Sequence, residues 1–177
     1  YSLAIAKIMW AYQFAILVDL YNNVPYSDAF NPTNLFPGYD DASSVYTDIV
    51  SQLDGALSDI ANAPADAENP GTYDVMFKGN MTNWQKFANT VKLRIFMHTS
   101  NSAGIAAIDK GIGFLTVDAA VNPGYANTAD NKQNPKWNDI GYDLSNQERG
   151  GHKYNRANSF AVDFYNEYND PRASQVY

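Results

Sequence analysis

DVMFKGNMTNWQKFANTVKLRIFM, residues Asp74 to Met97, is the most strongly patterned stretch of this chain. Its second half places apolar residues at spacings of three and four, the period of one face of an α-helix. These residues are Trp84, Phe87, Ala88, Val91 and Ile95. We therefore predict a helix over about 82–101, and we expect Trp84 and Phe87 to be largely buried.

The beginning of this helix carries a sequence signal of its own. Gly79 and Asn80 supply turn chemistry just before it. Thr82 is followed three positions later by Gln85, which is the pattern of a capping box. We predict that Thr82 is the N-cap and that its side chain accepts a hydrogen bond from the first turn.

Four further helices are expected, which makes the fold all-α with long irregular loops. Apolar periodicity places them at about 2–21, 42–61, 103–110 and 157–168. The first is apolar nearly all round, which predicts burial between neighbours. It ends at Asn22-Asn23, and Asn tolerates the left-handed conformation that closes helices. Asp40 or Asp41 can cap the second helix.

The three long helices are expected to begin near residues 2, 42 and 82. A spacing of about 40 is typical of helical-hairpin repeats. The length of 177 residues suits one domain, so we expect 1–177 to form a single helical domain. Residues 114–155 show no sustained period and are expected to form a long loop, which in a compact domain is usually functional.

Charge and composition limit the classes of partner. The net charge is −7, with only 12 Lys and Arg residues, so no basic stripe exists to bind DNA or RNA. Aromatic residues make up 14% of the chain, and the 13 Tyr outnumber the Lys and Arg residues together. Aromatic rings can stack on the apolar faces of sugars, and amides can bind hydroxyls, so this composition favours a polar, uncharged ligand.

Membrane and redox signals are sparse. The chain has no cysteine, which excludes disulfides and Cys-bound zinc. No uninterrupted apolar run approaches the roughly 18 residues that span a bilayer, so we expect no transmembrane helix. The chain begins with Tyr1 inside an expected helix, and we expect it to be part of a longer protein.

The candidate ligand-binding residues lie in the expected loop. Trp137, within QNPKWNDIGY, is a plausible stacking platform for a sugar ring. The alternative is that Trp137 anchors the loop to the core. Weaker candidates of the same kind are Tyr125, Tyr142, Asn134 and Asn138. Near the second helix, Phe36 and Tyr39 are expected to pack against its first turn.

No residue is assigned to catalysis, a metal or a cofactor. A glycosidase needs two carboxylates about 5–9 Å apart. The acids of the loop, which are more typical of a solvated segment, are Asp118, Asp130, Asp139, Asp143 and Glu148. Asp130-Asn131 with Asn134 offers oxygen ligands but lacks the spacing of a calcium loop. His98 and His152 lack a second metal-spaced ligand, and Arg94 and Arg172 are expected to bind internal carboxylates or carbonyls.

Four segments resemble the SusD/RagB family of outer-membrane nutrient-binding lipoproteins, including its shorter-looped SusD-like branch. They are Val18–Phe30 (VDLYNNVPYSDAF), Tyr39–Leu57, Asp74–Met97 and NDPR at Asn169–Arg172. The order and spacing of the segments agree with the family. Two positions depart from its pattern: Asn22-Asn23 stands where Gly-Asp is usual, and Asn80 where Asp is usual.

The resemblance implies a tetratricopeptide-like helical scaffold on the outer face of a Gram-negative outer membrane. Members of this family attach through an N-terminal lipid anchor, which we expect to lie outside this sequence. They bind oligosaccharides or other nutrients without catalysis and pass them to a TonB-dependent, SusC-like transporter. The family motifs are mainly structural, so the resemblance assigns none of them as a ligand contact.

Three hypotheses about function therefore remain. The first is non-catalytic binding of a glycan or other small nutrient for a partner transporter. The second is a helical-repeat scaffold that binds a protein partner. The third is a glycan hydrolase. The sequence does not name the ligand.

Overall fold

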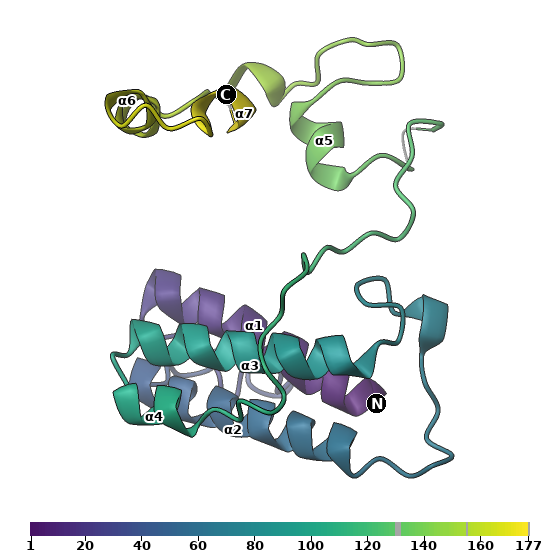
Figure 1. The fold of residues 1–177 in the computed structure, drawn as a ribbon, viewed down its shortest axis with the longest axis vertical. Coiled ribbons are helices and arrows are strands. Elements are labelled where there is room, and N and C mark those ends of the chain that lie inside the picture. The colour runs from purple at the N-terminus through teal and green to yellow at the C-terminus, as the bar shows by residue number, and fades with distance from the viewer. Residues whose placement is uncertain (130–131, 155, 177) are drawn as a thin grey trace. The chain divides into compact units, whose positions relative to one another are not determined.

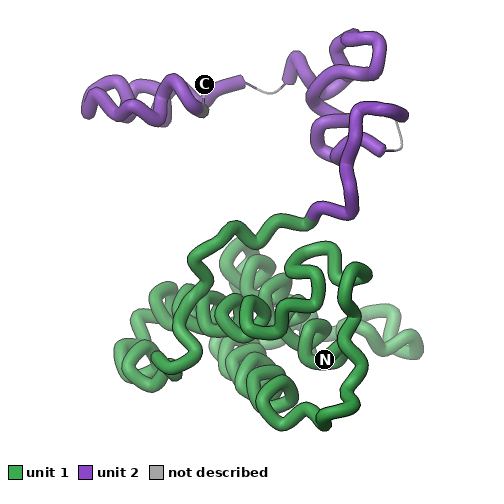
Figure 2. Tube along the Cα trace, turned by 45° about the vertical axis from the view of Figure 1, so that its right-hand side comes forward, with its two compact units in different colours: residues 1–121 green, residues 122–177 purple. Residues whose placement is uncertain are grey.

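The structure is a computed structural model that describes residues 1–129, 132–154 and 156–176. It contains two compact units, residues 1–121 and 122–177, which Figure 2 colours separately. Each unit is described by itself. Asp130 and Asn131, the centre of the calcium hypothesis, lie outside the described residues.

The first unit is built from three long helices and one short one. They are α1 (Ser2–Tyr21), α2 (Ala42–Ala61), α3 (Met81–His98) and α4 (Ser102–Ala107), with a short 3-10 helix at Gly71–Tyr73. The long helices pack against one another and run in alternating directions (Figure 1). Their starts keep the spacing of about 40 residues, and α3 ends three residues earlier than expected.

The second unit holds short helices. They are α5 (Pro135–Ile140), a 3-10 helix at His152–Tyr154, α6 (Ser159–Glu167) and α7 (Ala173–Val176). Within the described residues the regular elements are all helical. Val24 pairs with Asp40, and Tyr142 pairs with Glu148, in two isolated antiparallel bridges. The all-α prediction is confirmed. The segment 114–155 nevertheless contains α5, which at six residues is too short to show a helical period.

The core of the first unit forms where α1, α2 and α3 meet. Trp84 is 2% exposed and Phe87 is 7% exposed, so the prediction that both are largely buried is confirmed. Phe77 joins them, with its ring centroid 5.0 Å from that of Trp84 in an edge-on arrangement. Aliphatic side chains from the other two helices, including Ile8, Ile49 and Leu53, complete the cluster. Burial of this apolar surface is the main source of the unit's stability.

The turn before α3 is organised around the carboxylate of Asp74. This side chain, which is buried, accepts hydrogen bonds from the backbone N–H groups of Met76, Phe77 and Gly79 and from Nε1 of Trp84, at 2.7–3.1 Å. Gly79 has φ +78°, and a Cβ there would stand 2.1 Å from the side chain of a neighbouring loop residue. The turn therefore requires glycine at this position.

The N-cap of α3 is Asn80, so the prediction of Thr82 is wrong. The helix begins at Met81, and the side chain of Asn80 accepts a hydrogen bond from the N–H of Asn83 at 3.0 Å. Asn is at least as good an N-cap as Thr, and Asn80 comes first along the chain. At α2 the cap is Asp41, one of the two residues expected, which accepts from the N–H of Ser43.

The asparagines that depart from the pattern of the resemblance lie at helix ends. Asn22 ends α1 with φ +64° and ψ −98°, and a positive φ is the backbone setting that glycine adopts most readily. Asn23 accepts a hydrogen bond through Oδ1 from the N–H of Ala42, as an aspartate would. Asn80 caps α3, a role that Asp also fills well.

One face of α1 is exposed, which corrects the expectation that the helix is buried all round. The inner face packs on α2 and α3 through residues such as Ile8 and Val18. Leu3, Trp10 and Leu20 are exposed on the other side. Periodicity reports where apolar residues lie along a helix, but it does not report which neighbours are present.

The expectation that no segment could cross a membrane is also corrected. With 20 residues and a mean hydropathy of 1.5, α1 is long and apolar enough to cross a membrane, judged by length and composition alone. The reason is that its few polar residues, such as Lys7 and Gln13, do not offset its apolar ones. Core helices of globular domains pass the same test, and α1 contributes six buried residues to the core of the first unit.

Arg94 and Arg172 both bind carboxylates, as expected. Arg94 and His98, on α3, both contact Asp19 of α1 at 2.9 Å, and Tyr46 of α2 donates its hydroxyl to the same carboxylate at 2.6 Å. One carboxylate thus links the three long helices.

In the second unit, Arg172 binds Asp170 within the NDPR segment.

In the first unit, Phe36 and Tyr39 are 91% and 74% exposed, so the prediction that they pack against the second helix is wrong. The loop that carries them is instead tied by hydrogen bonds such as those of Asp28 with Asn31 and Asn34.

Candidate functional site

The candidate site lies in the second unit, around α5. Asn134 caps this helix, and its Oδ1 accepts hydrogen bonds from the N–H groups of Lys136 at 3.0 Å and of Trp137 at 3.4 Å. Pro135 follows at the first helical position, where its missing N–H costs nothing. The helix ends where the N–H of Gly141 donates to the carbonyl of Trp137 at 2.7 Å. This short helix fixes the backbone of Trp137.

Trp137 is 51% exposed and belongs to an aromatic stack. Its ring centroid lies 6.0 Å from that of Tyr142, which in turn lies 4.9 Å from that of His152. The three rings, which we call the Trp137 platform, are tilted to one another by about half a right angle, as aromatic pairs often are. Tyr142 thus contacts the tryptophan ring and is itself contacted by His152, while half of the indole surface faces solvent.

His152 is itself anchored. Its Nδ1 lies 2.9 Å from the carbonyl oxygen of Ile140 at the end of α5, so this nitrogen carries the proton and donates it. Its Nε2 lies 3.5 Å from the hydroxyl of Tyr142 and 3.9 Å from a carboxylate oxygen of Glu148. These contacts join the two ends of the segment that runs from α5 to the 3-10 helix.

The buried polar side chain of Gln133 binds the backbone of the platform residue Tyr142. Gln133, which is 7% exposed, donates through Nε2 to Oδ1 of Asn127 at 2.8 Å and to the carbonyl of Tyr142 at 3.2 Å. Nη2 of Arg149 donates a hydrogen bond to Oε1 of Gln133 at 3.4 Å. This network holds the backbone of Tyr142 in place.

Gly141 sets the position of the Trp137 ring. A Cβ at this glycine would stand 2.4 Å from Cδ2 and 2.6 Å from Cε2 of the indole, closer than real contacts allow. We expect Gly141→Ala to push the indole off the backbone and to alter the near-UV circular dichroism of the chain. The free energy of unfolding should fall by about 1–3 kcal/mol, because the added Cβ would also stand 2.7 Å from the backbone carbonyl oxygen of Trp137.

Gly150→Ala is the matched control, because nothing lies within 4 Å of the Cβ that it would add. Its near-UV spectrum should equal that of the wild type. An unchanged spectrum for Gly141→Ala would show that the indole does not rest on this glycine.

Four of the five predicted ligand-binding residues lie close together along the chain, from the N-cap of α5 to just after the helix. Trp137 and Tyr142 are in the platform, Asn134 is the cap, and Asn138 is partly buried. Among the described residues, Oδ1 of Asn138 is buried and has no hydrogen-bond partner. No ring contact joins Tyr125 to the platform in the described part of the chain, and its backbone N–H donates to Asn122.

Sequence reasoning missed two residues of this site. His152 was expected to be structural, and the sequence does not show that its ring supports Tyr142. Gly141 was not singled out. A glycine directly after a short helix headed by Asn-Pro is the one signal that could have indicated it.

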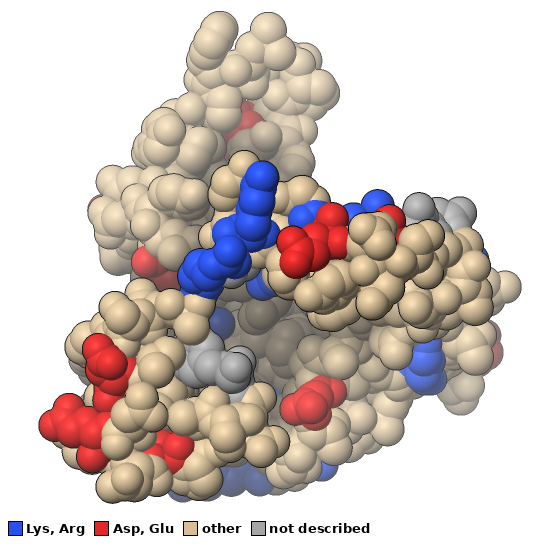
Figure 3. Space-filling model, turned by 90° about the horizontal axis from the view of Figure 1, so that it is seen from above, with Lys and Arg blue, Asp and Glu red and all other residues tan. Residues whose placement is uncertain are grey.

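Asp143, one of the acids of the expected loop, has a structural role. Oδ1 of Asp143 accepts hydrogen bonds from the N–H groups of Ser145 and Gln147, at 2.8 Å each. Among the residues that the structure describes, no group of three or more His, Asp or Glu side chains could hold a metal ion. The surface seen in Figure 3 is mostly uncharged, with Lys, Arg, Asp and Glu scattered over it.

Comparison with protein families gives one match over residues 1–177, to the SusD-like family described as "Starch-binding associating with outer membrane". A SusD/RagB family protein from Bacteroides thetaiotaomicron is 26% identical, with a TM-score of 0.70 over 96% of this chain and 34% of that one. A SusD-like protein from Bacteroidetes is 23% identical, with a TM-score of 0.71 over 97% of this chain and 33% of that one.

A third similar structure is a chitin-binding SusD homolog from Flavobacterium johnsoniae. It is 23% identical, with a TM-score of 0.56 over 66% of this chain and 26% of that one. The chain therefore spans about a third or less of the length of these solved structures. No curated protein matches the sequence.

Proposed function

The chain belongs to the SusD-like family, and we propose that it binds carbohydrate at a Gram-negative outer membrane without altering it chemically. Membership of the family, expected from four sequence motifs, is confirmed. The description of the family names starch and the outer membrane, and one similar structure is described as chitin-binding. Both sugars are neutral polymers of pyranose rings, which makes a neutral oligosaccharide the ligand class of choice.

The observation that carries the proposal is the Trp137 platform. A half-exposed indole that lies against Gly141 and contacts Tyr142, which His152 contacts in turn, offers a flat apolar face. Such a face can stack on the apolar side of a pyranose ring with little loss of conformational freedom. Polar side chains near the platform, Asn134 and Asn138 among them, stay candidates for contacts with sugar hydroxyls, as does Tyr125.

The proposal extends to a partner. In this family a nutrient is passed to a TonB-dependent, SusC-like transporter, and we propose the same for the whole protein to which this sequence corresponds. Surface exposure on the outer membrane is part of the same proposal. The family resemblance supports both, and no residue of this chain is assigned to the contact with the transporter.

Two other functions compete with this one. The helical pairing in the first unit, with an exposed apolar face on α1, also suits a scaffold that binds a protein. A hydrolase would need a pair of carboxylates on either side of the sugar. Release of reducing ends from maltohexaose or chitohexaose would favour the hydrolase, whereas binding without release supports the proposed function.

Affinity electrophoresis tests the proposal with little protein. The wild type should be retarded in a native gel that contains soluble starch or glycol chitin, relative to a gel without polysaccharide. Trp137→Ala should be retarded clearly less than the wild type. Tyr154→Ala is the control, because Tyr154 is an exposed ring of the same unit outside the platform. Equal retardation of wild type and Trp137→Ala would refute the assignment of the platform.

A further inference from the structure

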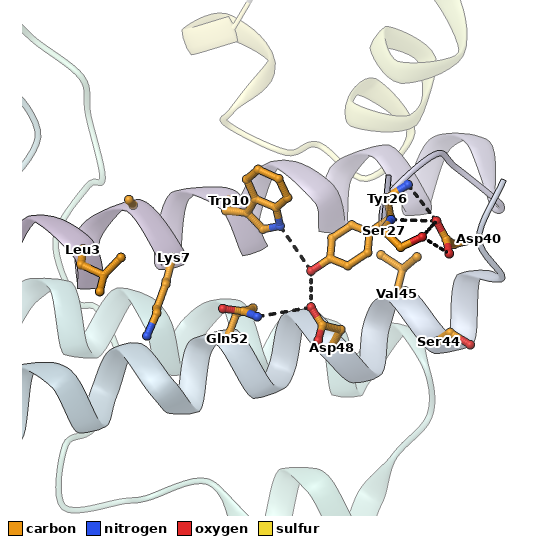
Figure 4. A pocket seen from close by; sticks show the side chains of 11 residues that line it. Leu3, Lys7, Trp10, Tyr26, Ser27, Asp40, Ser44, Val45, Asp48 and Gln52 are labelled. Atoms are coloured by element: carbon orange, nitrogen blue, oxygen red, sulfur yellow. Dashed lines mark hydrogen bonds between the residues drawn. The ribbon is translucent and has the colours of Figure 1, made fainter. Parts of the chain in front are cut away.

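An open groove runs along α1 and α2 in the first unit, far along the sequence from the Trp137 platform. Its volume is about 690 Å³, and Figure 4 shows the side chains that line it. They include Ala6 and Trp10 from α1, Tyr26 from the loop after α1, and Asp48 and Gln52 from α2. From Leu3 to Trp10 the groove follows seven residues of helix, or about 10 Å.

Trp10 presents an oriented ring beside this groove. It is 37% exposed, and its Nε1 donates a hydrogen bond to the hydroxyl of Tyr26 at 3.2 Å. The rings of Phe14 and Phe30 contact it, each with a centroid distance of 4.8 Å. The indole is therefore held by one hydrogen bond and two ring contacts while part of its surface stays open.

A chain of polar groups continues from Trp10 across the groove (Figure 4). The hydroxyl of Tyr26 donates to Oδ2 of Asp48, and Nε2 of Gln52 lies 3.4 Å from the same oxygen. Burial and the hydrogen bond to Asp48 raise the pKa of Tyr26 to about 12, so its hydroxyl stays protonated at neutral pH. A carboxylate can accept about four hydrogen bonds, which leaves Asp48 with capacity for a ligand hydroxyl.

We propose that this groove is a second binding site for a neutral oligosaccharide, separate from the Trp137 platform. An aromatic face beside fixed acceptors suits the two sides of a sugar, whose C–H faces stack and whose hydroxyls donate. The lining disfavours an anionic ligand, because Lys7 is already paired with Asp59 at 2.7 Å and the groove also holds the carboxylates of Asp40 and Asp48. The ligand class rests on the proposed function, whereas the site does not.

The three tryptophans of the chain give an experiment that reports both sites at once. Each indole N–H gives its own signal in a ¹H–¹⁵N correlation spectrum of the full chain. The signal of Trp10 reports the groove, that of Trp137 reports the platform, and that of the buried Trp84 is an internal control. Titration with maltohexaose and with chitohexaose should shift the Trp10 signal with at least one sugar and leave the Trp84 signal in place.

A variant that fills the groove avoids the removal of a packed ring. Ala6 is exposed on α1 and lines the groove, so Ala6→Phe should weaken the binding seen at Trp10 by about tenfold or more. The Trp137 response should not change. Ala61→Phe, at an exposed alanine at the end of α2, is the matched control and should bind as the wild type does.

The outcomes separate the groove from the proposed function. A Trp10 shift that Ala6→Phe suppresses supports the groove, with or without a shift at Trp137. A shift at Trp137 alone, or a Trp10 shift that Ala6→Phe leaves unchanged, overturns the groove and leaves the platform standing. If neither signal moves with either sugar, the groove and the platform both fail.

Discussion

Replacement of Trp84 by alanine lowers the free energy of unfolding by about 3–5 kcal/mol. The side chain is 2% exposed and packs edge-on against Phe77 and Phe87, so its removal leaves a cavity among rigid rings. It also removes the indole N–H that donates to Asp74 at 2.7 Å. The loss is a large share of the 5–15 kcal/mol by which a typical domain is stable.

Urea unfolding followed by far-UV circular dichroism measures this change, because the signal does not depend on the tryptophan that is removed. Trp137→Ala is the control. Its half-exposed ring should cost about 1 kcal/mol or less. If Trp84→Ala and Trp137→Ala destabilise the chain equally, the view that α3 is the centre of the core is wrong.

Replacement of Asp74 by asparagine costs about 3 kcal/mol at pH 7. The carboxylate accepts four hydrogen bonds, three from backbone N–H groups and one from Trp84. An amide can keep the donors on its oxygen side, but its NH₂ group then faces donors on the other side. Buried donors without an acceptor cost about 1–3 kcal/mol each.

The same substitution should flatten the dependence of stability on pH. Burial alone would raise the pKa of Asp74, but hydrogen bonds from Gly79, Trp84 and Phe77 outweigh it and hold the pKa below its usual value. A carboxyl whose pKa is lower in the folded chain contributes stability above its unfolded pKa, near 3.9. That contribution is lost as the pH falls through the lower, folded value.

Urea unfolding between pH 5 and pH 2.5 checks this expectation. The wild type should lose more stability over that range than Asp74→Asn does. Asp66→Asn, at an exposed aspartate in the preceding loop, should leave both the stability at pH 7 and the pH dependence close to those of the wild type. Parallel pH profiles for wild type and Asp74→Asn would contradict the role given to this carboxylate.

Much of the first unit could be predicted from the sequence because long helices repeat their apolar pattern over several turns. Trp84 and Phe87 sit in such a pattern, and both are buried. Two details of the predicted fold, the N-cap of α3 and the burial of α1, were wrong, each for a physical reason. Asn80 and Thr82 are both good caps two residues apart, and local sequence does not decide between them. The open face of α1 depends on which neighbours are present, which periodicity does not report.

The candidate site was predictable only in part. Trp137 was singled out as an aromatic residue in a polar segment, and the structure exposes half of it. Its support by Tyr142 and His152 depends on how the chain turns between α5 and His152, where hydrogen bonds such as those of Asp143 replace a repeating pattern. Trp10 lies in the first helix, which is apolar nearly all round, so the sequence does not single it out from the other apolar residues there. The residues that identify the family thus lie mainly in packing and turns, and the candidate contacts lie outside them.

Isothermal titration calorimetry of the full chain with maltohexaose and chitohexaose tests the central claim most directly, which is that Trp137 binds a sugar ring. At least one sugar should bind the wild type, and Trp137→Ala should weaken that binding by about tenfold. Trp137→Phe keeps a smaller ring face and should lie between the two. If neither sugar binds, or if Trp137→Ala binds as tightly as the wild type, the account of this site is contradicted.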